Sequence, residues 1–135
     1  METRGEFTPE SIEDARELAE RLGPAAQLVV RETAQSMGFD RDEYRERVTA
    51  DVVETARDAL FASLLRVFVG TRSEFDEWLF DRELEVVEIG SEQVDHVVWH
   101  AFDGTVVAAT FQNEPDAAVS TLRRQAFGRC YKDHL

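Results

Sequence analysis

The chain has 135 residues, of which 28 are acidic and 15 basic, and its formal net charge at pH 7 is −13. The single cysteine excludes an internal disulfide and a multi-cysteine metal site, and no apolar stretch is long enough to cross a bilayer. Because the first ten residues are polar and contain no apolar signal region, we expect a cytoplasmic protein without a membrane contact.

The acidic excess is accompanied by an almost complete lack of lysine, since Lys132 is the only one in the chain. Repulsion among so many carboxylates is strong in dilute buffer and is screened at molar salt, where the Debye length is about 3 Å. The alternative is an ordinary acidic protein, but such proteins usually keep more than one lysine. We therefore favour a halophilic protein.

Three helices are predicted before any strand. Thr8, which precedes a proline, is the predicted N-cap of the first helix. The second helix is predicted over about residues 24–37. Asp40 and Glu43 predict a capping box, which begins a third helix over about residues 41–63.

Residues 64–69 suit either a buried strand or two further helical turns. We favour a strand because a glycine follows it, and because Thr71 with Glu74 predicts another capping box. This box begins a short helix over residues 72–80, which leads to a strand at residues 84–89. If residues 64–69 form a strand, the crossover makes the two strands parallel.

Residues 94–111 predict a β-hairpin, in which two apolar, β-branched runs flank the dipeptide Asp103-Gly104. This dipeptide tolerates the positive φ angles of a two-residue type I′ turn. Such a turn fixes the register and places His100 opposite Val107. Both faces of the hairpin are mostly apolar, so we expect protein on both sides.

A final helix is predicted over about residues 115–132. The order of elements predicts an α+β fold with three N-terminal helices, then a three- or four-stranded, mainly antiparallel sheet with one crossover helix and a C-terminal helix. We expect a single domain over residues 1–135, with a helical part over about residues 8–63 and a sheet-containing part over about residues 64–135. The strand order stays open at this point.

The predicted hairpin carries the first group of candidate site residues, His96, Trp99 and His100. The backbones of His96 and His100 are about 13 Å apart along one face of a strand, too far to share a metal ion about 2 Å from each ring. We therefore expect histidines of the core or of an interface. No nucleotide-binding, hydrolase or zinc motif is present, and we expect no catalytic residue, metal or cofactor.

The second group lies at the C-terminal end, where residues 117–132 contain four cations and no acid. Helical geometry places Arg123 beside the apolar stripe, where we expect a structural ion pair. Arg124, Arg129 and Lys132 are then the candidate contacts to a partner or an anion, if they do not pair with local acids. Nucleic acid is a disfavoured partner because a chain with a net charge of −13 repels phosphate.

Four segments carry a resemblance, namely residues 22–27 (LGPAAQ), 40–48 (DRDEYRERV), 56–65 (ARDALFASLL) and 122–129 (LRRQAFGR). On these segments the chain resembles an uncharacterised conserved family of haloarchaeal proteins with no assigned activity. The resemblance implies a haloarchaeal host and a cytosolic setting. It transfers no functional residue.

We expect a non-enzymatic cytosolic interaction protein of a halophilic archaeon, which forms a homo-oligomer such as a dimer or binds another protein. The alternative is a small ligand-binding domain or an enzyme, with a pocket between sheet and helices near His100. A polar cavity where an acid meets His100 would favour the alternative. An exposed apolar patch over Trp99 or over residues 44–52 would favour the interaction protein.

Overall fold

The computed structural model describes residues 1–135 and contains six α-helices and five β-strands. In chain order they are β1 (Glu2–Arg4), α1 (Ile12–Arg21), α2 (Gly23–Ser36), α3 (Arg41–Arg47), α4 (Ala50–Leu64), β2 (Val67–Thr71), α5 (Arg72–Leu79), β3 (Glu85–Ile89), β4 (His96–Phe102), β5 (Thr105–Phe111) and α6 (Pro115–Ala126). The backbone then continues as a π-helical turn, η1 (Phe127–Tyr131), and a 3₁₀ turn, η2 (Lys132–His134). The predicted α+β fold class is confirmed.

The strands form one sheet in the order β1-β2-β4-β5-β3. All neighbours are antiparallel except β5 and β3, which are parallel. The sheet is therefore mainly antiparallel, as predicted, but it has five strands rather than three or four. The additional strand, β1, has the sequence Glu-Thr-Arg and pairs with Val67–Val69 of β2. It has no apolar run of its own, so it is a strand only because it pairs with β2.

The predicted hairpin is confirmed in its turn and its register. Asp103 and Gly104 have φ angles of 49° and 81°, as a type I′ turn requires. His100 lies opposite Val107 in the β4–β5 pairing. The conformational preferences of the two turn residues therefore determine the register of β4 and β5.

The predicted choice of a strand after the third helix is also correct, although β2 begins three residues later, at Val67. The Thr71 hydroxyl accepts a hydrogen bond from the backbone N–H of Glu74 at 3.2 Å, and the Glu74 carboxylate accepts one from the Thr71 N–H at 3.0 Å. This capping box begins α5. The β2 and β3 strands run in the same direction, as predicted, with β4 and β5 between them.

The start of the first helix was predicted wrongly. Its N-cap is Ser11, whose hydroxyl accepts from the Asp14 N–H at 3.1 Å, rather than Thr8. Phe7 instead lies extended beside the end of α4, where its N–H donates to the Leu64 carbonyl at 2.8 Å. This long-range pairing keeps the chain extended past the proline that follows Thr8.

The predicted third helix is divided into α3 and α4. Val48 and Thr49 both have extended backbone angles, and Thr49 is the N-cap of α4. Both residues are β-branched and thus restricted inside a helix. Because α3 buries no side chain, packing does not offset the free-energy cost of placing these two residues inside a continuous helix. The predicted capping box of Asp40 and Glu43 at the start of α3 is confirmed.

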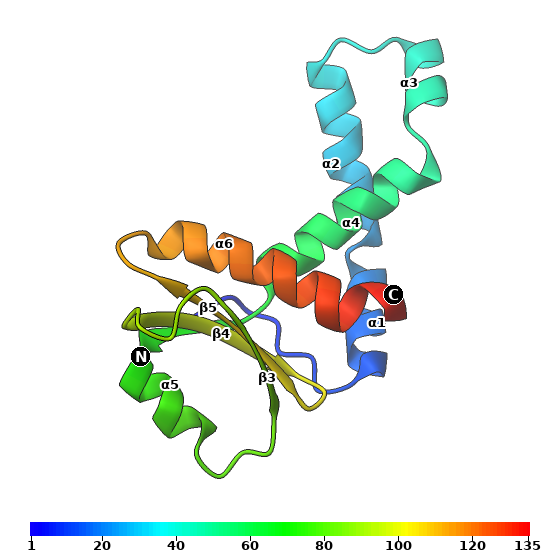
Figure 1. Cartoon of the computed structure of the whole chain (residues 1–135). Coiled ribbons are helices and arrows are strands. Elements are labelled where there is room, and N and C mark those ends of the chain that lie inside the picture. Colours follow the sequence, from blue (N-terminus) through cyan, green and yellow to red (C-terminus); the bar gives the residue numbers. More distant parts are fainter.

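Helices cover both faces of the sheet to different extents (Figure 1). One face packs against α1, α4 and α6 and holds the larger core, to which Phe61 of α4 and Leu122 of α6 contribute. The other face carries a smaller core around Trp99 and Phe75, covered by α5. His100 and Trp99 are neighbours on β4 and therefore belong to opposite faces.

A helical arm, which we define as residues 23–60, projects away from the sheet (Figure 1). Its helix α2 packs against α4 through three buried residues, Ala26, Val30 and Ala34. No other side chain of the arm is buried. Several large apolar side chains are instead well exposed, namely Leu28, Val29, Met37 and Val52. The arm has little core of its own.

Candidate functional site

The three candidate residues on β4 are not brought together. His96 is exposed and its ring centre lies 5.3 Å from that of Phe111. Trp99 is fully buried on the α5 side, with ring centres of Phe75 and Phe68 at 5.0 and 5.5 Å. His100 faces the other side of the sheet. These residues therefore line no common pocket.

His100 is 2% exposed, and both of its ring nitrogens are hydrogen bonded inside the protein. Its Nδ1 lies 2.6 Å from the Arg66 carbonyl oxygen, and its Nε2 lies 2.6 Å from the Tyr131 hydroxyl. A carbonyl can only accept, so Nδ1 carries the proton and Nε2 accepts from the tyrosine. Burial lowers the pKa of His100, although the bond to the Arg66 carbonyl opposes this effect. His100 is therefore neutral and has no free nitrogen for a ligand.

The candidate cations at the C-terminal end are exposed and free of ion pairs. No carboxylate lies within 4 Å of Arg124, Arg129 or Lys132. Arg129 makes one hydrogen bond along its own helix, from Nε to Gln125 at 3.3 Å. These three charges are available to a partner, which keeps the prediction of a contact open.

The ion pair predicted for Arg123 does not form. Its Nε donates to the backbone carbonyl of Leu65 at 3.0 Å, and no carboxylate lies within 4 Å. Leu65 lies at the end of α4, 58 residues earlier in the chain. The arginine therefore joins α6 to a backbone group that helical geometry alone could not identify.

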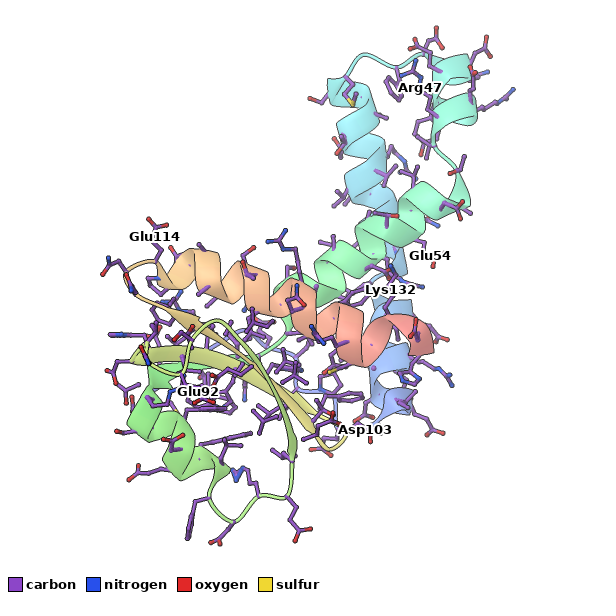
Figure 2. The ribbon with its side chains drawn as sticks, in the orientation of Figure 1. Arg47, Glu54, Glu92, Asp103, Glu114 and Lys132 are labelled. Carbon is purple, nitrogen blue, oxygen red and sulfur yellow. The ribbon has the colours of Figure 1, made fainter.

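An open groove of about 580 Å³, the α4–α6 groove, lies between these two helices and continues along η1 and η2. Asp51, Glu54 and Asp58 form its α4 wall, whereas Arg124 and Lys132 line the opposite wall. Figure 2 labels Glu54 and Lys132 on these two sides. No ion pair spans the groove within 4 Å. The groove therefore has one acidic and one basic wall without direct contact between them, and on the acidic side Arg57 of α4 pairs with Asp58 at 2.8 Å and with Glu54 at 4.0 Å.

Sequence reasoning did not single out the acidic wall. Asp51, Glu54 and Asp58 recur at spacings of three and four, which place them on one helix face. That signal was present but had little weight in a chain with 28 acidic residues. In the structure these three carboxylates lie on the wall that faces Arg124 and Lys132.

A second open groove, about 410 Å³ in volume, adjoins the first and shares Arg124, Ala59 and Ala62 with it. We call it the arginine pocket. Its polar lining comes from β1, α4 and α6 and consists of Arg4, Ser63, Asp116, Ser120, Arg123 and Arg124. The Arg4 guanidinium pairs with Glu2 at 2.8 Å and with Asp116 at 2.7 Å. The contribution of Arg4 was missed because β1 was not predicted.

No group of three or more His, Cys, Asp or Glu side chains is arranged to hold a metal ion. No helix combines the length and the apolar character that crossing a membrane requires.

Comparison with known proteins identifies a family for this chain. A family model described as a family of unknown function, DUF5809, matches residues 6–132. No curated protein and no solved structure matches the chain.

Proposed function

The chain belongs to DUF5809, a family of unknown function, and we propose that it is a non-enzymatic interaction protein that assembles with a second copy of itself. The contact surface is the α4–α6 groove together with the exposed apolar side chains of the helical arm. The observation that carries this proposal is the opposite charge of the two groove walls.

A two-fold dimer uses the same surface on both copies, so this surface must be complementary to itself. The α4–α6 groove meets that condition because Glu54 lies on one wall and Lys132 on the other. A two-fold rotation can place the basic wall of each copy against the acidic wall of its partner. Charge complementarity of this kind fixes orientation and register more than it adds affinity.

The helical arm supports the proposal with apolar surface. Leu28 is 52% exposed and Met37 is 65% exposed, while only three alanine and valine side chains of the arm are buried. Helices of this length depend on tertiary packing for stability. Covering the arm with a second copy supplies that packing and leaves the cations at the rim of the interface, as in other protein interfaces.

The surface needed for such a dimer is modest. A standard interface buries roughly 800 Å² per partner, whereas the chain exposes 8540 Å² in all. Two chains of net charge −13 repel each other at low ionic strength. Molar salt screens this long-range repulsion and leaves short contacts intact. The charge and the single lysine support the cytosol of a halophilic archaeon as the setting.

We prefer assembly to a ligand pocket beside His100 because both ring nitrogens of this residue are bonded within the protein. An enzyme that used His100 would first have to break the bond to Tyr131 or to the Arg66 carbonyl. The α4–α6 groove requires no such change.

The test is sedimentation equilibrium in molar KCl with two single substitutions, Lys132→Glu and Glu54→Lys. Each places like charges across the proposed interface, and each occurs twice in a two-fold dimer. We expect each to weaken the dimer at least about tenfold. The double variant exchanges the signs of the two positions, and we expect it to recover much of the affinity.

Arg21→Glu is the matched control, since it makes the same charge change as Lys132→Glu at an exposed position of α1 outside the groove. We expect the control to dimerise like the wild type. A wild-type chain that stays monomeric at high protein concentration would refute the proposal. Failure of the double variant to regain affinity over both single variants would refute the groove as the interface.

A further inference from the structure

We propose that the arginine pocket binds a phosphate-type dianion, either inorganic phosphate or the phosphate group of a small phosphorylated molecule. This site needs only one copy of the chain. Arg4, Ser120 and Arg123 do not line the α4–α6 groove, so the proposal does not rest on the dimer.

The central residue of the pocket is Arg123, a half-buried arginine with most of its donors unused. Its Nε–H is held by the Leu65 carbonyl at 3.0 Å, which fixes the plane of the guanidinium. The other guanidinium N–H groups make no hydrogen bond within the protein. Burial and the charge of Arg4 lower the pKa of Arg123. A bound anion would oppose both effects and accept the unused donors.

The backbone next to the pocket is shaped around this arginine. Gly5 has a φ of 99°, and a Cβ there would collide with the Leu65 carbonyl and lie 2.8 Å from Nη2 of Arg123. Only glycine allows both the positive φ and this close approach. The glycine therefore lets the end of β1 lie against Arg123 and brings Arg4 into the same pocket.

The charges in the pocket favour a dianion over a single carboxylate. Arg4 is paired with Glu2 and Asp116, whereas Arg123 and Arg124 have no carboxylate within 4 Å. The pocket lining contains three arginines and the single carboxylate of Asp116, and its net charge of +2 matches the charge of a phosphate monoester, about −2 at neutral pH. Guanidinium groups bind phosphate oxygens in bidentate geometry.

The remaining lining suits the same ligand. Ser63 of α4 and Ser120 of α6 line the pocket, and their hydroxyls can contact phosphate oxygens. The Ser63 hydroxyl now donates to the Leu60 carbonyl at 2.7 Å, whereas Ser120 makes no hydrogen bond through its hydroxyl. A volume of about 410 Å³ admits a phosphate together with a small carrier. The chain is strongly acidic overall, whereas this pocket is lined by three arginines and a single carboxylate.

The experiment is a titration of the protein with inorganic phosphate at constant KCl concentration, in which phosphorus NMR measures the binding. We expect saturable binding to the wild type. Arg123→Gln and Arg124→Gln each remove one charge-assisted contact, and we expect each to weaken binding about tenfold or more. Arg129→Gln removes the same charge from an exposed site outside the pocket and should change the affinity less than about twofold.

Arg123→Gln also removes the bond to Leu65, so its fold is checked by circular dichroism. If this variant unfolds, Arg124→Gln still tests the pocket, because Arg124 is exposed and makes no hydrogen bond within the protein. The titration is repeated with glycerol phosphate to distinguish the two sources of the phosphate group. If the protein binds glycerol phosphate more tightly than it binds inorganic phosphate, the ligand is a phosphorylated molecule. Equal affinity for the two probes identifies the free anion. Absence of saturation by both probes in the wild type would overturn the proposal. An equal loss of affinity in Arg129→Gln would also overturn it, since net charge alone would then explain the binding.

Discussion

Replacing Tyr131 by phenylalanine tests the hydrogen bond that joins the C-terminal turn to the sheet. The Tyr131 ring packs against Phe102 and Phe61, with ring centres 4.4 and 5.1 Å apart, and phenylalanine keeps these contacts. The substitution removes only the hydroxyl that donates to His100 Nε2 at 2.6 Å. It therefore leaves one buried acceptor without a partner.

The expected cost follows from the burial of this acceptor. Leaving a buried polar group unsatisfied costs about 1–3 kcal/mol, and His100 at 2% exposure has no access to water that could replace the hydroxyl. We expect the free energy of unfolding to fall by about 2 kcal/mol. For a chain of this length that loss lowers Tm by roughly 6–10 °C.

The measurement is urea unfolding in molar KCl, read by circular dichroism, with the free energy taken from curves of equal slope. Tyr44→Phe is the matched control, because Tyr44 is the other tyrosine and its hydroxyl makes no hydrogen bond within the protein. We expect the control to change stability by less than about 0.5 kcal/mol. If Tyr131→Phe costs no more than this control, the bond to His100 does not stabilise the fold and the reasoning is wrong.

Three further predictions concern the turn, the charge and the buried histidine. Gly104→Ala should destabilise the protein by roughly 1 kcal/mol in urea unfolding, because its φ of 81° is strained for alanine although no atom blocks the new methyl group; a neutral result would contradict the strain argument. The Tm should rise clearly between dilute buffer and molar KCl, because salt screens repulsion within a chain of net charge −13; a constant Tm would contradict the halophilic interpretation. Burial lowers the pKa of His100 in the folded protein, so as the pH falls this histidine is protonated first in the unfolded chain. The stability contributed by the neutral ring is therefore complete above about pH 6.5 and is lost as the pH falls below that value. The stability difference between the wild type and His100→Gln should therefore narrow by up to about 1.4 kcal/mol per pH unit below 6.5, in urea unfolding curves at several pH values; a difference independent of pH would argue against a neutral, buried ring.

Features that depend on neighbouring residues could be predicted from the sequence. The Asp103-Gly104 turn fixed the register of β4 and β5, because backbone sterics leave few residues able to adopt two positive φ angles in succession. The capping boxes at Asp40 and Thr71 began α3 and α5 as expected, because each satisfies its own backbone donors within three residues. The α+β class followed from the order of these elements.

Features that depend on distant contacts were decided by the tertiary structure. Strand β1 exists because β2 supplies its hydrogen bonds, and the pairing of Phe7 with the end of α4 moved the start of α1 to Ser11. The same holds for the two grooves, since the sequence identified Arg124 and Lys132 as candidates but gave no indication of which acids face them. Periodicity determines which face of a helix is polar. Only the packing of α6 against α4 brings one polar face opposite another, and only β1 carries Arg4 to Arg123.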